Sequence, residues 1–93
     1  MIKSFRCKET NKVFNRTFLK KLPGDIQKIG FRKLRMLNRA TIINDLKVPP
    51  GNKLELLHDD RNGQYSIRIN DQWRICFNWI DQDAYNVEIV DYH

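Results

Sequence analysis

Residues 65–77, with the sequence YSIRINDQWRICF, decide the fold of this 93-residue chain. Apolar and polar residues alternate on both sides of a polar turn, Asn70-Asp71-Gln72, and a third alternating run follows at residues 85–90. A period of two is typical of strands that bury one face. The sequence therefore predicts an antiparallel meander of three strands.

The short turn also predicts how the first two of these strands pair. Residues directly opposite each other in a sheet share a face, so pairing Ile69 with Trp73 keeps the apolar side chains together and places Arg68 opposite Arg74. Two arginines so placed repel each other by a few tenths to about 1 kcal/mol. In one interpretation, nearby acids such as Asp71 satisfy both side chains. In the other, the pair is a clamp for a phosphate, whose oxygens match guanidinium groups well.

The N-terminal half is predicted to be mostly helical. Residues 1–6 are expected to form a short opening strand, and residues 8–16 a polar helix. A second helix is expected after Pro-Gly-Asp, with Asp25 as its N-cap because a carboxylate accepts from the first unpaired amides. This helix is expected to run to about Arg39.

The two halves together predict a single α+β domain over residues 1–93. A further helical turn is expected over residues 41–46, and the Pro-Pro-Gly-Asn stretch within residues 47–52 breaks the helical pattern. The helices are predicted to cover the apolar face of a twisted antiparallel sheet, which leaves Arg68 and Arg74 on its open face.

Charge is distributed unevenly along the chain. With 17 Lys and Arg against 11 Asp and Glu, the net charge is +6 and the isoelectric point is about 9.6. Residues 1–48 hold 13 basic and 3 acidic residues, a balance of +10, whereas residues 49–93 hold 4 and 8, a balance of −4. The second predicted helix carries a basic stripe at helical spacing, which is either a solvated face or a surface for a polyanion. The basic stripe consists of Lys28, Arg32, Arg35 and Arg39.

Length and motifs exclude several classes of protein. The chain is too short for separate cofactor and substrate domains, and it has no glycine-rich phosphate loop or nucleophile elbow, so no cofactor is expected. His58, Asp91 and His93 match no metal-binding motif, so no metal is expected either. No window approaches 18 apolar residues, and no secretory signal stands out. We therefore expect a cytoplasmic protein with no membrane partner.

The last three residues, Asp91-Tyr92-His93, follow a predicted strand next to the arginine pair. An acid, a phenol and an imidazole can share proton transfer while Arg68 and Arg74 stabilise the charge of a phosphorane. Such a set can cleave RNA without a metal, because the 2′-OH of the substrate attacks the adjacent phosphorus. The alternative is that Tyr92 packs and His93 has no chemical role.

Two segments resemble the HigB family of toxins: residues 60–77 (DRNGQYSIRINDQWRICF) and residues 87–93 (VEIVDYH). The opening MIKSF and the PPGN turn at residues 49–52 are similar as well, so the resemblance covers essentially the whole chain. It implies the RelE-superfamily fold and a type II toxin. Such a toxin is a ribosome-dependent endoribonuclease, or mRNA interferase, which cuts translated mRNA in the decoding site and arrests growth.

The resemblance also implies partners. These are a cognate HigA-like helix-turn-helix antitoxin, the 70S ribosome and its mRNA, and operator DNA only through the toxin–antitoxin complex. Lys20, Lys21 and the basic stripe are expected to dock on ribosomal RNA. The catalytic residues of the family fall on Arg74, Asp91, Tyr92 and His93, and supporting phosphate contacts fall on Arg61 and Arg68.

The sequence departs from the family in one place. Relatives often have Leu-Lys-Gly-Asp-Arg where residues 57–61 read LHDDR, so His58 replaces a catalytic lysine of some relatives. We expect either weaker electrostatic stabilisation or proton transfer by His58 itself. Two other functions stay open: a non-catalytic basic module that binds RNA or DNA, and a degenerate toxin that acts mainly as a co-repressor with its antitoxin.

Overall fold

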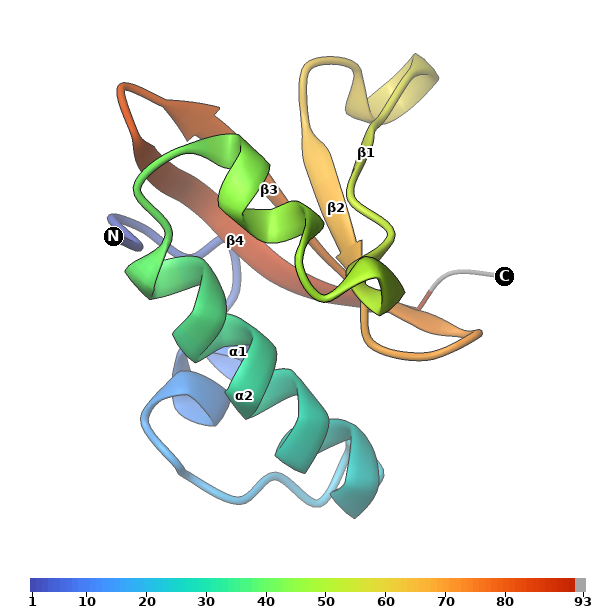
Figure 1. The fold of residues 1–93 in the computed structure, drawn as a ribbon. Helices are drawn as coiled ribbons and strands as arrows, with labels where there is room; N and C mark the ends of the chain where they lie inside the picture. The colour runs from blue at the N-terminus through green and yellow to red at the C-terminus, as the bar shows by residue number, and fades with distance from the viewer. Residues whose placement is uncertain (92–93) are drawn as a thin grey trace.

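The computed structural model describes residues 1–91 (Figure 1). Two helices lie against a four-stranded antiparallel sheet, and three short 3₁₀ helices lie in the connections. The helices are α1 (Lys8–Phe14) and α2 (Gly24–Arg39), and the strands are β1 (Glu55–Leu56), β2 (Tyr65–Arg68), β3 (Trp73–Ile80) and β4 (Asp83–Asp91). The 3₁₀ helices are Ile43–Lys47, Pro50–Asn52 and Asp59–Arg61. The predicted α+β class is confirmed.

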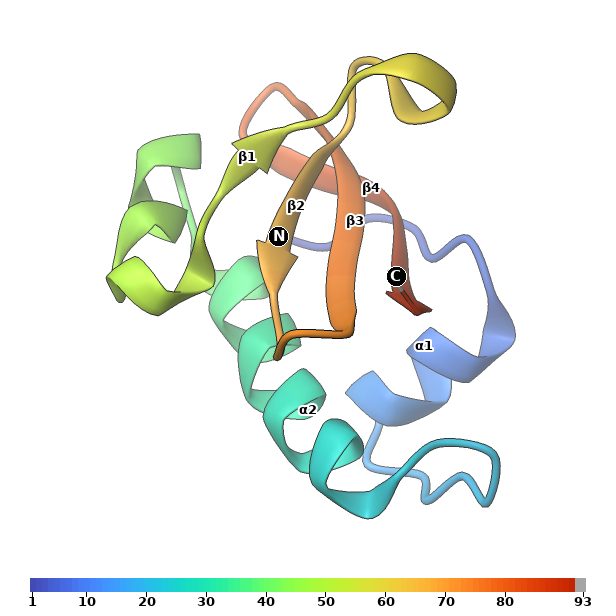
Figure 2. The same cartoon turned by 90° about the vertical axis from the view of Figure 1, so that its right-hand side faces the viewer.

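The sheet has the order β1-β2-β3-β4, and Figure 2 shows the four strands side by side. The predicted meander is β2, β3 and β4, and Arg68 pairs with Arg74 as the turn predicted. The Asn70 side-chain oxygen fixes that turn by accepting from the amides of Gln72 and Trp73, each at 2.8 Å. The two-residue strand β1 was not predicted, because it is too short to show an alternating pattern.

The prediction of an opening strand over residues 1–6 is wrong. Its backbone pairing with β4 consists of two isolated parallel bridges, Ile2 with Ala84 and Phe5 with Val87, and not of a continuous ladder. Between them the β4 backbone turns left-handed at Asn86 (φ 54°), where the register with β3 also shifts. The Ser4 side-chain oxygen accepts from the Asn86 amide at 2.8 Å, in place of a continuous ladder.

The start of α2 also differs from the prediction. Its N-cap is Pro23, and Asp25 lies in the first turn. The Pro23 carbonyl accepts from the Gln27 amide at 3.1 Å, so the helix begins before Asp25, whose carboxylate accepts only from the next amide, that of Ile26, at 3.0 Å. The predicted end at Arg39 is confirmed, and the predicted further turn is the 3₁₀ helix Ile43–Lys47.

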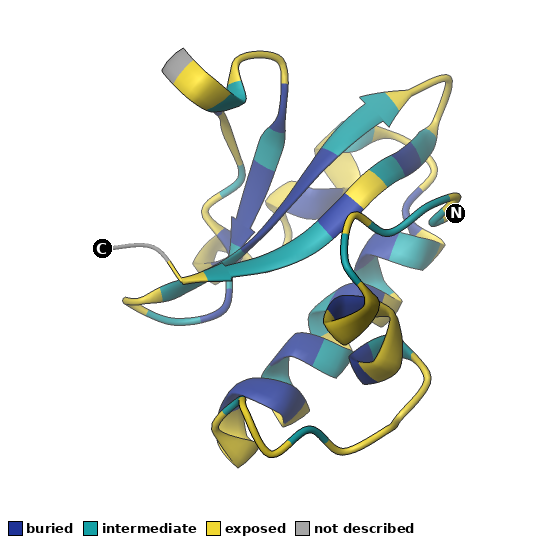
Figure 3. Ribbon diagram, turned by 180° about the vertical axis from the view of Figure 1, so that it is seen from behind, coloured by how far each residue is buried: buried dark blue, intermediate teal, exposed yellow. Residues whose placement is uncertain are grey.

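The core lies between α2 and the face of the sheet that carries the apolar residues (Figure 3). Leu34 and Leu37 of α2 are fully buried there. At Gly30 the helix lies close to β4, since a Cβ at that position would lie 3.3 Å from Ile89 Cδ1. Each buried aliphatic side chain contributes about 1.5–3 kcal/mol. The strands contribute Ile67, Ile69, Ile75, Phe77 and Val87. No helix within residues 1–91 is long and apolar enough to cross a membrane.

Candidate functional site

The face of the sheet turned away from the helices carries polar side chains in rows across the strands. One row crosses all four strands, and the next contains the arginine pair. We call this surface the open face, and the residues that define it are Glu55, Ser66, Cys76 and Glu88 in the first row and Arg68, Arg74 and Val90 in the second.

Arg74 is the most firmly held of the charged side chains on the open face. Its Nε donates to Ser66 Oγ at 2.7 Å, and its Nη2 donates to the Lys53 carbonyl at 2.7 Å. Glu55 lies 3.7 Å from Nη2, and only 13% of the Arg74 side chain is exposed. Lys53 adopts a left-handed conformation (φ 44°) at the end of the Pro50–Asn52 helix, and its carbonyl faces Arg74. Within residues 1–91 no acceptor is bonded to Nη1 of Arg74, so this nitrogen is available to a phosphate oxygen.

Arg68 is paired within its own turn. Its Nη2 forms an ion pair with Asp71 Oδ1, and the Asp71 side chain is 99% exposed. The side chain also lies near enough to α2 to act on Lys33. Burial lowers the pKa of Lys33, and the positive charges of Arg32 and Arg68 lower it further. For Arg68, therefore, the structure agrees with the interpretation in which a nearby acid satisfies the arginine.

Arg61 belongs to a network of side chains around Glu88. Its Nη1 donates to Glu88 Oε1 at 2.7 Å and to Gln64 Oε1 at 3.0 Å. Arg6 Nε lies 3.8 Å from the same oxygen of Glu88. The thiol of Cys76 is completely buried in the same row. Burial raises the pKa of Cys76, so the thiol stays protonated.

The remaining predicted catalytic residues lie at two different places. His58 is exposed next to Leu57, whose amide bonds to the Gln64 carbonyl at 2.7 Å. Gln64 is four residues before Arg68, or about 13 Å along an extended chain, so His58 lies well away from the arginine row. Asp91 ends β4 opposite Trp73 and accepts from Gln72 Nε2 at 3.1 Å.

Asp91 and Arg74 therefore lie at the same end of the sheet. Successive strand residues point to opposite faces, so Asp91 shares the face of its partner Trp73, whereas Arg74 lies on the open face. Tyr92 and His93 lie outside the described residues. The structure thus pairs Arg68 with Arg74 and places Asp91 at the same end of the sheet but on its other face. Arg61 contacts Glu88 in the other row of the open face.

Two groups that hold Arg74 were missed by the sequence reasoning. Ser66 was detectable, because it lies two residues before Arg68 and so shares its face. The Lys53 carbonyl was not detectable, because a main-chain atom carries no sequence signal. Among residues 1–91, no group of three His, Cys, Asp or Glu side chains is placed to hold a metal ion.

The basic stripe is exposed along its whole length, as helical periodicity predicted. Lys20 and Lys21 are exposed in the connection before α2. Lys33, which is outside the stripe, is partly buried and donates to Asn52 Oδ1. The cations of the basic stripe are thus exposed, whereas Lys33 on the same helix is held by Asn52.

The fold is similar to that of a chain in solved toxin–antitoxin complexes. A chain of the YoeB–YefM complex from Staphylococcus aureus superimposes with a TM-score of 0.62 at 18% identity, over 100% of this chain and 98% of that one. A heterotetrameric YoeB–YefM toxin–antitoxin complex from the same organism matches with the same TM-score. These likenesses extend over nearly the whole length of both chains and show that the fold is shared.

The amino-acid sequence identifies the family. A model described as "RelE-like toxin of type II toxin-antitoxin system HigB" matches residues 3–93. Toxin HigB-1 of Vibrio cholerae is 43% identical over 65 residues, which cover 70% of this chain and 68% of that protein. Endoribonuclease HigB of Proteus vulgaris is 37% identical over the full length of both chains. The chain belongs to the HigB-like toxins of type II toxin–antitoxin systems, as the resemblance in its sequence implied.

Proposed function

We propose that this toxin is a ribosome-dependent endoribonuclease that cleaves translated mRNA in the decoding site by attack of the 2′-OH. The observation that carries the proposal is Arg74, which is fixed by Ser66 and the Lys53 carbonyl and whose Nη1 is bonded to no acceptor among the described residues. A full-length relative named as an endoribonuclease supports the same reaction. Action on translating ribosomes would take place in the cytoplasm.

In the proposed mechanism Arg74 stabilises the negative charge that develops on the phosphorane. Such preorganised donors are worth about 10²–10³ in rate. Asp91, Tyr92, His93 and His58 share proton transfer and orientation, and the reaction needs no metal. The base is not assigned to one of them.

Arg61 and Arg68 are proposed as supporting phosphate contacts. Each is paired with a carboxylate in the free protein, Arg61 with Glu88 and Arg68 with Asp71. The Arg68 pair is easy to exchange for a phosphate, because Asp71 is almost fully exposed and exposed ion pairs contribute only about 0–1 kcal/mol. Arg61 keeps Glu88 as an orienting partner, because the Glu88 side chain is only 15% exposed.

Docking on the ribosome is proposed to use Lys20, Lys21 and the basic stripe. Their exposure on the helical side of the molecule supports contact with the phosphates of ribosomal RNA. The antitoxin is proposed to be a HigA-like helix-turn-helix protein, with operator DNA bound only through the complex.

The proposal is tested by inducing the toxin in cells and mapping transcript 5′ ends. Cuts that follow the codon phase of translated messages are the expected result, and growth arrest without such cuts would overturn the proposal. A toxin truncated after Asp91 separates the enzyme from a non-catalytic RNA-binding module, because only the enzyme becomes harmless. Antitoxin binding without mRNA cleavage would instead indicate a co-repressor.

His58 provides a separate test. If the histidine weakens electrostatic stabilisation relative to the lysine of some relatives, His58→Lys speeds cleavage in a ribosome-programmed assay. If His58 transfers a proton, the same change alters the dependence of the rate on pH between about pH 6 and 8. Identical rates for the two proteins across that range would remove His58 from the catalytic set.

A further inference from the structure

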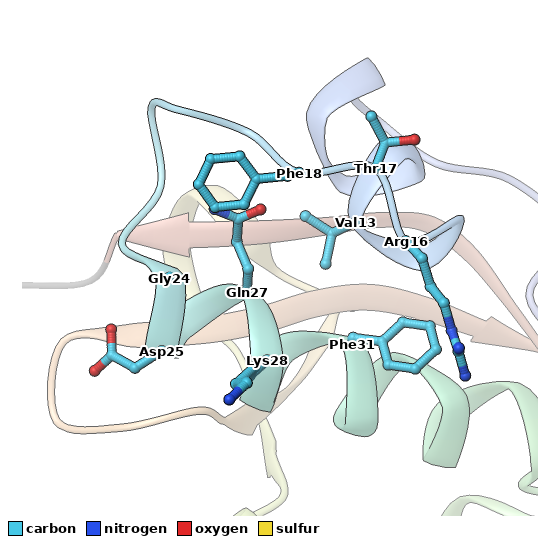
Figure 4. A pocket seen from close by; sticks show the side chains of 9 residues that line it. All are labelled: Val13, Arg16, Thr17, Phe18, Gly24, Asp25, Gln27, Lys28 and Phe31. Atoms are coloured by element: carbon cyan, nitrogen blue, oxygen red, sulfur yellow. The ribbon is translucent and has the colours of Figure 1, made fainter.

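A pocket of about 610 Å³ opens between α1, the start of α2 and the connection over residues 15–23 (Figure 4). Its size is typical of sites that take a large side chain or a small ligand. Val13, Phe18 and Phe31 give it apolar walls. Phe18 is 71% exposed, which is unusual for an aromatic residue that a hydrophobic core could have buried.

The segment that presents Phe18 is held in place by Gln27 of α2. The Gln27 side chain is 92% buried and forms three hydrogen bonds to the connection. Its Nε2 donates to the carbonyls of Leu19 at 2.6 Å and Leu22 at 2.8 Å, and its Oε1 accepts from the Leu19 amide at 2.8 Å. Phe18 is next to Leu19, so its exposure does not come from a loose loop. A preorganised wall lowers the entropic cost of binding.

The rim of the pocket is basic. Arg16 and Lys28 line it, and the Arg16 guanidinium lies 4.8 Å from the centre of the Phe31 ring. Asp25 is the one acid in the lining. Lys20 and Lys21 add exposed positive charge in the same connection. A complementary partner therefore combines an apolar side chain with neighbouring carboxylates.

We propose that this pocket is a docking site for the antitoxin, and that it takes an apolar anchor from an acidic segment of that protein. The family supplies the class of partner, since its members belong to toxin–antitoxin systems. Charge complementarity and the apolar walls supply its chemistry. A second copy of this chain fits less well because it brings the same net charge of +6. RNA would use the cations but gain little from the recessed apolar floor.

The position of the pocket has a consequence for neutralisation. It lies among the helices, whereas Arg74 lies on the open face. The antitoxin can therefore bind without covering Arg74. Because Lys28 belongs to both the pocket and the basic stripe, a bound antitoxin competes with ribosomal RNA for α2. This inference concerns binding and does not depend on the reaction proposed above.

The test compares Phe18→Ala with Val48→Ala in the full-length toxin. Val48 is a matched control, since it is 70% exposed against 71% for Phe18 and does not line the pocket. Titration calorimetry with the purified antitoxin encoded beside the toxin gives the affinities. We expect Phe18→Ala to weaken binding about tenfold or more, as at the anchor of an interface, and Val48→Ala to leave it within about twofold. Phe18→Asp should weaken binding further, because it places a carboxylate against an acidic partner.

Unchanged antitoxin affinity in Phe18→Ala would overturn the proposal. The proposal would also be overturned if Phe18→Ala lost ribosome binding, or self-association, while it kept antitoxin binding. The pocket would then bind RNA or a second copy of this chain. Matching melting temperatures of the three variants and wild type show that the effects do not come from unfolding. mRNA cleavage by the same preparations is measured in parallel. Absence of cleavage by wild type would count against the proposed reaction and not against the docking site.

Discussion

Among single residues, Arg74 matters most for the proposed reaction, and its role depends on how its guanidinium is oriented. Ser66 is fully buried although it is polar, and its hydroxyl is bonded to Arg74 Nε. The left-handed turn at Lys53 directs a carbonyl to the other end of the same guanidinium. The side chain is thus oriented before substrate arrives, which is how a donor stabilises a transition state without a cost of reorganisation.

Replacing Ser66 by Ala is expected to slow mRNA cleavage by about 10–100-fold, because the loss of a hydrogen bond to a charged group costs roughly 1.5–3 kcal/mol. The reduction should fall on kcat, since Ser66 orients a group that acts in the transition state. Thr41→Ala is the matched control, because it removes a hydroxyl hydrogen bond at an exposed site on Asp45. Equal rates for both variants would mean that Arg74 needs no orientation by Ser66.

Arg74→Lys tests the guanidinium itself. A lysine keeps the charge but cannot bond to Ser66, the Lys53 carbonyl and a phosphate together. We expect cleavage in a programmed-ribosome assay to fall about 100-fold. Arg68→Lys should have a much smaller effect, because Arg68 pairs with an exposed acid in its own turn and is not fixed by Ser66 and a main-chain carbonyl. Similar losses in the two variants would contradict the distinct role of Arg74.

At the scale of elements, the alternating pattern of residues 65–77 predicted β2, β3 and the pairing of Arg68 with Arg74. A register shift of one residue would have turned every apolar side chain outward, so the pattern left little choice. Features set by main-chain geometry were not predictable. These are the two-residue strand β1, the early start of α2 at Pro23 and the Lys53 carbonyl at Arg74. In the candidate site, residue types indicated the open face but not which acid pairs with which arginine.

The basic stripe of α2 yields a prediction about salt. Arg32→Gln with Arg35→Gln should weaken ribosome binding and reduce the slope of log affinity against log salt by about 2, one unit per lost phosphate contact. The matched control replaces Lys3 and Lys47 by Gln, because both are exposed and lie outside the stripe. The same weakening in both double variants would show a net-charge effect and not a docking surface.

The 3₁₀ helix after α2 yields a prediction about pH. The Thr41 and Ile42 amides bond to the Asp45 carboxylate at 2.9 and 3.3 Å, and these bonds lower the pKa of Asp45. A pKa lowered in the folded state gives stability that is complete above the ordinary pKa and is lost as the pH falls through the folded value. Asp45→Asn should therefore lower the Tm at neutral pH, and the difference from wild type should shrink below about pH 4. Asp81→Asn, in an exposed turn, should show no such dependence.

At the scale of the whole molecule, the chain separates two surfaces. The helices carry the basic stripe and the apolar pocket, and the far side of the sheet carries Arg74 with a network of acids and amides. The charge of +10 in residues 1–48 and −4 in residues 49–93 follows this division. In our account, the ribosome positions the message and the toxin supplies the catalytic face.

The most direct test of this account uses purified toxin, 70S ribosomes and a defined mRNA, with primer extension to map the cuts. We predict that wild type cuts the mRNA only when ribosomes are present, at the codon in the decoding site, and that Arg74→Ala reduces this cut by about 100-fold or more. Equal cleavage of the mRNA without ribosomes, or undiminished cleavage by Arg74→Ala, would contradict the account.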